Sequence, residues 1–141
     1  MDDSQPASYR AMLAMATRAL EGAHEAGLDS SLVELVKIRV SQLNGCTFCL
    51  QLHSGEALAA GEMPDRLAVL PAWRDSAQFT VAERAALEVA EDVTLVAHRT
   101  STASATAQPT ALLPTQRAAV QWIALAMNAL NRAAIASARH S

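Results

Sequence analysis

Apolar residues recur at helical spacing along most of this chain, and prolines and glycines mark where the spacing starts and stops. No stretch alternates between apolar and polar residues in the way that a half-buried strand requires. The chain contains 31 alanines and only 4% aromatic residues, a composition that favours closely packed helices. Its 141 residues suit one domain. We therefore expect residues 1–141 to form a single all-α domain, a bundle of about six helices.

Start and stop signals place the expected helices. Proline suits the first helical turn, and glycine suits the residue just after a helix end. Ser31 with Glu34, and Thr80 with Glu83, match the capping box, in which each residue bonds the backbone N–H of the other. The expected helical segments are 6–27, 31–45, 46–61, a short piece bracketed by Pro64 and Pro71, 80–98, and one that begins at Pro114.

The polarity of each segment indicates how it is buried. The apolar stripe of the first helix consists of Tyr9, Met12, Leu13, Ala16, Leu20 and Ala23. The side of the fifth helix opposite its apolar positions carries Glu83, Arg84, Glu91 and Asp92. The last helix is apolar on all sides, so we expect it to be buried centrally or in a subunit interface. Residues 99–110 are rich in Ser, Thr and Ala without apolar periodicity and are expected to form a loop.

Charge and hydropathy exclude several classes of protein. The formal net charge is −3, and the ten arginines and Lys37 are scattered, so we expect no nucleic-acid partner. The N-terminal residues lack the basic and apolar regions of a secretory signal. The longest charge-free apolar stretch, 118–130, is too short to span a bilayer. We expect a cytoplasmic protein with no membrane partner.

Two cysteines and a histidine lie at the start of the third expected helix. Cys46, Cys49 and His53 are spaced i, i+3 and i+7, so they share one face of that helix. The positive end of a helix dipole stabilises a thiolate, which makes a thiol there nucleophilic at neutral pH. His53 is close enough to Cys49 to exchange a proton directly or through one water. Cys46 can resolve an oxidised Cys49 by forming a disulfide.

The residues alone leave other roles for this cysteine–histidine pattern open. Both cysteines can be small buried hydrophobic residues, as free cysteines often are. Cys46, Cys49 and His53 can also supply three metal ligands. The candidates for a fourth ligand are Glu34, His24 and His98. A thioredoxin-like use requires a preceding strand, which the sequence lacks. The histidines without a partner at helical spacing, which we expect to be structural, are His24, His98 and His140.

Glu34 lies on the expected helix that precedes the cysteines. Its simplest role is in the capping box with Ser31. A second role follows if the Asn44-Gly45 turn folds the third helix back on the second. Glu34 would then approach His53 and complete a carboxylate–imidazole–thiol relay.

A longer motif surrounds these residues. Segment 34–49 reads ELVKIRVSQLNGCTFC, and it is followed by His53 and by Glu56-Ala57. This combination of Glu34, the Asn-Gly turn, Cys-x-x-Cys and a histidine closely resembles the core motif of the AhpD-like alkylhydroperoxidases, within the carboxymuconolactone decarboxylase superfamily. Weaker similarity continues through 72–74, 79–80 and 83–87, and the closing Asn128 and Asn131-Arg132.

The resemblance implies an all-helical fold that assembles into trimers or hexamers. It implies that Cys49 attacks an organic hydroperoxide and that Cys46 is the resolving thiol. His53 and Glu34 are implied to be the proton relay that activates Cys49. In the family the disulfide is reduced by a dithiol such as dihydrolipoamide or by a redox partner protein, and no bound cofactor is required. We therefore expect a thiol-dependent peroxidase.

The chain departs from the resembled family at two positions. The best-studied branch has a histidine directly before the second cysteine, where this chain has Phe48. Leu130 stands where many relatives have a tryptophan between two asparagines. Decarboxylase relatives generally lack the cysteine pair, which favours thiol redox chemistry. The alternative functions are a non-enzymatic metal-binding or redox-sensing protein, and a decarboxylase or lactone-directed member of the superfamily.

Overall fold

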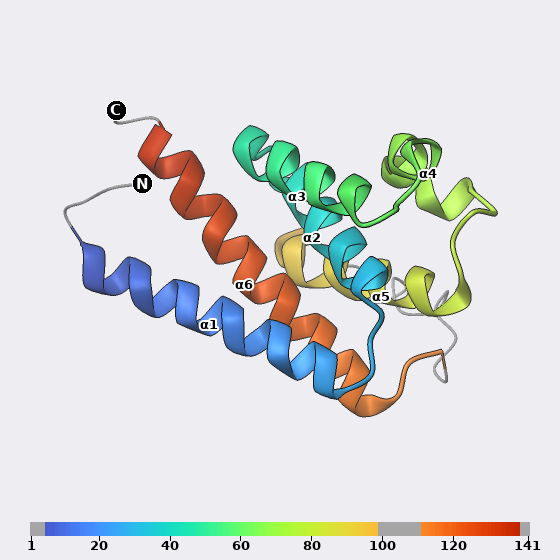
Figure 1. Ribbon diagram of the computed structural model, residues 1–141, viewed down its shortest axis with the longest axis horizontal. Coiled ribbons are helices and arrows are strands. Elements are labelled where there is room, and N and C mark those ends of the chain that lie inside the picture. Colours follow the sequence, from blue (N-terminus) through green and yellow to red (C-terminus); the bar gives the residue numbers. More distant parts are fainter. Residues whose placement is uncertain (1–4, 99–110, 139–141) are drawn as a thin grey trace.

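The computed structural model describes residues 5–98 and 111–138 (Figure 1), and every regular element within them is a helix. The α-helices are α1 (Pro6–Glu25), α2 (Ser30–Asn44), α3 (Thr47–Ala59), α4 (Pro64–Val69), α5 (Val81–Thr94) and α6 (Pro114–Ala138). Two 3₁₀ helices follow α4 and α5, namely η1 (Leu70–Asp75) and η2 (Val96–His98). The predicted all-α fold is confirmed, while the loop predicted at 99–110 and His140 lie outside the described residues. None of the helices described here has both the length and the apolar composition to cross a bilayer.

A shared backbone motif closes three of the helices. Gly45, which follows α2, has a left-handed conformation with φ of 67°. Its N–H donates to the carbonyl of Gln42 at 3.2 Å, and the N–H of Cys46 donates to the carbonyl of Ser41 at 3.1 Å. These two bonds form a Schellman motif, which favours glycine because a Cβ is strained at positive φ. The glycines at the corresponding positions after α1 and α3 are Gly27 and Gly61.

The helix starts follow the predicted signals except at α2. Thr80 N–H donates to Oε1 of Glu83 at 2.8 Å, and Glu83 N–H donates to Thr80 Oγ1 at 3.1 Å, so this predicted capping box is confirmed. The capping box predicted for Ser31 and Glu34 is wrong, because Asp29 is the N-cap residue of α2. Glu34 consequently lies beyond the first turn of the helix, where its carboxylate faces a neighbouring helix instead of its own N-terminus.

Helix α2 lies between the other helices and packs against α3, α5 and α6, while α1 packs along α6 (Figure 1). The larger apolar cluster joins α1, α2, α5 and α6, largely through alanine and valine side chains. The smaller cluster joins α2, α3, α5 and η1, and its buried members include Leu35, Ile38, Leu70, Trp73 and Leu87. Because α2 contributes to both clusters, packing on two sides holds this helix in place before the chain turns into α3.

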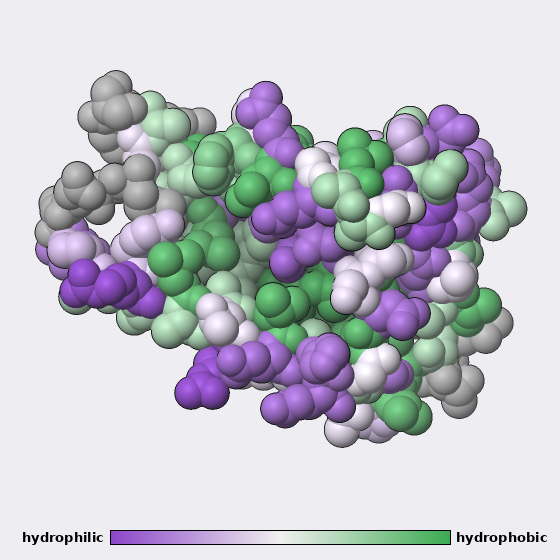
Figure 2. All heavy atoms as spheres, viewed as in Figure 1, coloured by the Kyte–Doolittle hydropathy of each residue, from purple (hydrophilic) through white to green (hydrophobic). Residues whose placement is uncertain are grey.

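The apolar surface of α1 and α6 differs from the prediction. On α1 the buried side chains are alanines, whereas Leu13 and Leu20 of the predicted stripe are exposed. On α6, Trp122 is 55% exposed and Leu125 is also exposed, so central burial of the whole helix is wrong for the single chain. Figure 2 shows hydrophobic side chains along the face that α1 and α6 form. Burial of this face in a subunit interface stays a prediction.

Glu91, on the side of α5 opposite its apolar positions, is largely buried by an ion-pair network. Its carboxylate accepts hydrogen bonds from Nε1 of Trp73 at 2.8 Å, from Nε of Arg39 at 3.0 Å, and from Arg74. Burial alone raises the pKa of a carboxyl group. The hydrogen bonds from Arg74, Trp73 and Arg39 outweigh burial and hold the pKa of Glu91 below its ordinary value. The network connects α2 and η1 to α5.

Candidate active site

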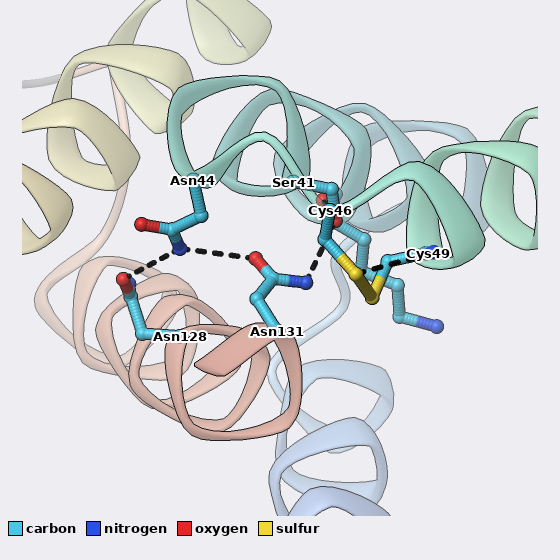
Figure 3. The surroundings of a disulfide bond; sticks show 7 residues. Ser41, Asn44, Cys46, Cys49, Asn128 and Asn131 are labelled. Carbon is cyan, nitrogen blue, oxygen red and sulfur yellow. Dashed lines mark hydrogen bonds between the residues drawn. A yellow bond between two sulfur atoms is a disulfide. The ribbon is translucent and has the colours of Figure 1, made fainter. Parts of the chain in front are cut away.

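Cys46 and Cys49 are joined by a disulfide at the N-terminal end of α3 (Figure 3). Cys46 is the N-cap residue of this helix, and its Sγ accepts a hydrogen bond from the backbone N–H of Cys49 at 3.3 Å. The two Cα atoms are 5.3 Å apart, within the range that a disulfide spans. Both residues are buried. On reduction, a thiolate formed here would lie at the positive end of the α3 dipole.

His53 lies one helical turn beyond Cys49 and faces two carboxylates. Its Nδ1 atom is 3.8 Å from Oε2 of Glu34 on α2, and 3.1 Å from Oε2 of Glu56 on its own helix. The side chains of His53 and Glu34 are 13% and 19% exposed, whereas that of Glu56 is 52% exposed. The turn at Gly45 therefore folds α3 back along α2, and Glu34 approaches His53 as the relay hypothesis requires.

The two oxygens of the Glu34 carboxylate have different surroundings. Oε1 accepts a hydrogen bond from Nζ of Lys37 at 3.0 Å. Oε2 is buried and has no hydrogen-bond partner among the described residues. A buried carboxylate oxygen is strongly stabilised by a donor. Nδ1 of His53 lies 3.8 Å from this oxygen, but its hydrogen bond, at 3.1 Å, is with Oε2 of Glu56.

The sequence motif does not reveal the contacts of Lys37 and Glu56. Both lie three residues from the group that they contact: Lys37 from Glu34, and Glu56 from His53. Helical spacing of i and i+3 places side chains on one face, so this spacing is the signal that identifies them.

A buried polar network ties the end of α2 to α6 (Figure 3). Nδ2 of Asn44 donates to Oδ1 of Asn128 and to Oδ1 of Asn131, both at 3.0 Å. Nδ2 of Asn131 donates to Oγ of Ser41 at 3.1 Å. The partners are 84 to 90 residues apart in the chain, so no local pattern in the sequence predicts that they meet.

The remaining histidines in the described residues are exposed. His24 lines a groove of about 510 Å³ between α1 and α2, and Glu34 and Lys37 also line this groove. His98 lies in η2. His53 and the two cysteines are not among the residues that line this groove.

A different set of residues from the predicted one is close enough to hold a metal. The sulfurs of Cys46 and Cys49 are bonded to each other, so the predicted cysteine-based ligand set does not form in this oxidation state. One ligand atom each from Glu34, His53 and Glu56 lie within 4.8 Å of one another. A histidine nitrogen and two carboxylate oxygens suit a divalent cation such as zinc.

The chain is similar in sequence to known proteins over part of its length. The model of the carboxymuconolactone decarboxylase family matches residues 6–92. The uncharacterized protein YdfG of Bacillus subtilis (strain 168) is 40% identical over 72 residues, which cover 51% of this chain and 49% of YdfG. The uncharacterized protein YnjA of Escherichia coli (strain K12) is 36% identical over 64 residues, covering 45% of this chain and 35% of YnjA. The matched region thus spans half or less of these curated relatives.

A solved structure has a similar fold. The crystal structure of a protein of unknown function from Agrobacterium tumefaciens, described as a candidate antioxidant defence protein AhpD, matches with a TM-score of 0.72. It is 25% identical in sequence, and the match covers 93% of this chain and 88% of that protein. The family match includes Glu34, the turn at Gly45, the cysteine pair and His53. This chain therefore belongs to the carboxymuconolactone decarboxylase family and has the AhpD-like fold that its motif predicts.

Proposed function

We propose that this protein is a thiol-dependent peroxidase that reduces organic hydroperoxides with the Cys46–Cys49 pair. The observation that carries the proposal is the disulfide at the N-terminal end of α3. It lies one turn before a histidine whose Nδ1 is 3.8 Å from Oε2 of Glu34. A helix N-terminus stabilises a thiolate, and a histidine–carboxylate pair transfers protons. Reduction of a hydroperoxide by a thiol needs a stabilised thiolate and a proton for the departing alkoxide.

In the proposed cycle, the thiolate of Cys49 attacks the terminal oxygen of the hydroperoxide. The O–O bond breaks, Cys49 becomes a sulfenic acid, and the alkoxide takes up a proton and leaves as an alcohol. The thiol of Cys46 then attacks the sulfenic sulfur, which forms the disulfide and releases water. A dithiol such as dihydrolipoamide, or a redox partner protein, supplies two electrons and two protons to restore both thiols. The cycle requires no bound cofactor.

His53 is the proposed carrier of the proton. With a proton on Nδ1 facing the carboxylates, Nε2 of the neutral ring is free to accept the proton of the Cys49 thiol, directly or through one water. The imidazolium that results is stabilised by Glu34, whose side chain is largely buried. The same proton is then available for the departing alkoxide, so the relay returns to its starting state within the first half of the cycle.

The surface of α3 near the dithiol favours an apolar substrate. Phe48, which lies between the two cysteines in the sequence, is 66% exposed, and Leu52 is also exposed. Exposed aromatic and aliphatic side chains beside a reactive thiol suit the organic part of a hydroperoxide better than they suit hydrogen peroxide.

Self-association is part of the same proposal. The exposed apolar face of α1 and α6 includes Trp122, the kind of large side chain that subunit interfaces bury. A homo-oligomer, as the resemblance implies, would cover this face.

Titration of the thiols with a hydroperoxide tests the proposed function. Reduced protein is mixed with one equivalent of cumene hydroperoxide, and free thiols and intact mass are measured before and after. We expect loss of both thiols and a mass decrease of about 2 Da, because two thiols lose two hydrogens in forming the disulfide. Protein whose cysteines are alkylated beforehand is the control and should consume no peroxide.

Unchanged thiols in that titration would contradict the peroxidase proposal. They would favour the second candidate, a metal-binding protein, for which the specific observation is the group of Glu34, His53 and Glu56. Metal analysis of the same sample then distinguishes the two. Stoichiometric zinc that is lost in a His53→Ala variant supports the metal-binding function.

Paired substitutions of the two carboxylates test which one assists His53. Glu34→Gln is expected to lower kcat/KM for the hydroperoxide by about tenfold or more, since a largely buried charge opposite the imidazole is lost. Glu56→Gln is expected to change it by less than about threefold, because the exposed charge of Glu56 is screened by solvent. Steady-state kinetics of both variants provide the measurement. A larger loss in the Glu56 variant would show that His53 is oriented within its own helix and that Glu34 has no part in the relay.

A further inference from the structure

The polar network between α2 and α6 lies beside the turn that leads to Cys46 (Figure 3). Ser41 and Asn131 are fully buried, and Asn128 is almost fully buried. Most of the surrounding core is alanine, valine and other apolar side chains, which would hold the helices together without any of these amides. Buried polar groups of this kind contribute specificity of position more than they contribute attraction.

Asn131 is the member of the network that makes two contacts with the last turn of α2, directly before the turn at Gly45. Its Oδ1 accepts from Nδ2 of Asn44, the last residue of α2, and its Nδ2 donates to Oγ of Ser41, one turn earlier. Ser41 Oγ donates in turn to the carbonyl of Lys37 at 2.8 Å. Each of these donors therefore has a defined acceptor, and the amide of Asn131 fits in one orientation only.

The same serine anchors the first cysteine. The carbonyl of Ser41 accepts the N–H of Cys46 at 3.1 Å, and this bond is half of the Schellman motif at Gly45. Cys46 in turn is the N-cap of α3 and receives the N–H of Cys49 on its Sγ. Asn131 on α6 therefore holds the side chain of Ser41, and the backbone carbonyl of the same serine holds the N–H of Cys46.

We propose that Asn131, acting through Ser41, is a positioning residue for the dithiol, a role that rests on the proposed function of the Cys46–Cys49 pair. By fixing the backbone at Cys46, it keeps the two Cα atoms near their separation of 5.3 Å in the reduced protein as well. Two thiols held at bridging distance lose little conformational freedom when they form a bond. The anchor therefore shifts the dithiol–disulfide equilibrium toward the disulfide, and its removal shifts that equilibrium toward the dithiol.

The test is the equilibrium of the protein with a small dithiol in the absence of peroxide. Protein dithiol and oxidised dithiothreitol exchange two electrons and two protons to give protein disulfide and reduced dithiothreitol. Asn131→Ala and Ser41→Ala are each expected to lower the equilibrium constant for disulfide formation by about threefold to tenfold. Thiol trapping followed by mass spectrometry measures the two forms. Ser41→Ala keeps the core volume nearly unchanged. It therefore tests the effect of the anchor on the equilibrium even if Asn131→Ala does not fold.

Thr94→Val is the matched control. Thr94 lies at the far end of the network, where its Oγ1 accepts from Nδ2 of Asn128 at 3.0 Å, and it makes no hydrogen bond to the turn. Its replacement should lower the denaturation midpoint while leaving the redox equilibrium within about twofold of the original protein. The proposal is overturned if both anchor variants stay within that twofold range, or if the control shifts the equilibrium as much as they do.

This experiment is independent of peroxidase activity. Because no hydroperoxide is present, a protein that fails to reduce peroxides can still show the shift, and an active peroxidase can fail to show it. The two proposals are therefore tested separately.

Discussion

Replacement of Cys49 by serine is expected to abolish hydroperoxide reduction, with a loss on the order of 10³-fold or more in kcat/KM. The serine hydroxyl remains protonated at neutral pH and is a far weaker nucleophile toward a peroxide bond than a thiolate. The side chain is buried and similar in size, so the fold should tolerate the change. Consumption of cumene hydroperoxide, with dihydrolipoamide as reductant, is the measurement.

Cys46→Ser provides the matched comparison. This variant retains the proposed attacking thiol, so it should consume about one equivalent of hydroperoxide and then stop, with a sulfenic acid on Cys49 that a dimedone probe traps. Cys46→Ser should therefore complete a first turnover that Cys49→Ser lacks. Neither variant should sustain steady-state turnover through the disulfide. If the single burst appears in Cys49→Ser instead, the roles of the two cysteines are reversed.

Glu91→Ala is expected to lower the free energy of unfolding by about 3 kcal/mol. Its removal leaves Nε of the largely buried Arg39 side chain and Nε1 of Trp73 without their acceptor, although Nη1 of Arg39 keeps its hydrogen bond to Gln42. Urea denaturation followed by circular dichroism measures the change. Glu21→Ala is the control, because the Arg18–Glu21 pair is mostly exposed and its loss should cost less than about 1 kcal/mol. Equal effects of the two substitutions would show that the Glu91 network does not stabilise the fold.

Glu91 also makes the free energy of unfolding depend on pH. The lowered pKa of its carboxyl group sets the direction of that dependence. Because the folded state lowers the pKa of Glu91 below 4.5, the folded protein binds this proton more weakly than the unfolded chain does. The stabilisation is therefore present above about pH 4.5 and is lost as the pH falls through the lower folded-state value. Glu83 acts in the same direction, since hydrogen bonds from Arg66 and Thr80 outweigh the opposing effect of burial on its pKa. Glu91→Ala should accordingly lose less of its remaining stability below pH 4.5 than the original protein.

Local features of the sequence predicted the helices and the cysteine face. Proline at helix starts, glycine after helix ends and the Thr80–Glu83 capping box act within a few residues, so their effects can be read without the tertiary structure. The spacing of Cys46, Cys49 and His53 is likewise a property of one helix. The approach of Glu34 to His53 was one of two open alternatives, because it depends on the turn at Gly45 and not on spacing alone.

Long-range contacts account for what the sequence did not predict. Arg39 and Glu91 are 52 positions apart, so their pairing depends on how α2 and α5 pack. The asparagine network joins residues that are still more distant. The Ser31–Glu34 capping box failed for a local reason: Asp29 and Ser31 are both suitable N-caps, and the helix begins two residues earlier than the box requires.

The disulfide joins residues only three positions apart, so it closes a very short loop and restricts the unfolded chain little, by about 2 kcal/mol at most. The backbone on both sides is already fixed by the Schellman motif before it and by helix α3 after it. Opening the disulfide consequently releases only a small constraint on the unfolded chain. In the proposed cycle, the disulfide can therefore open and close while the helices on both sides of it stay folded.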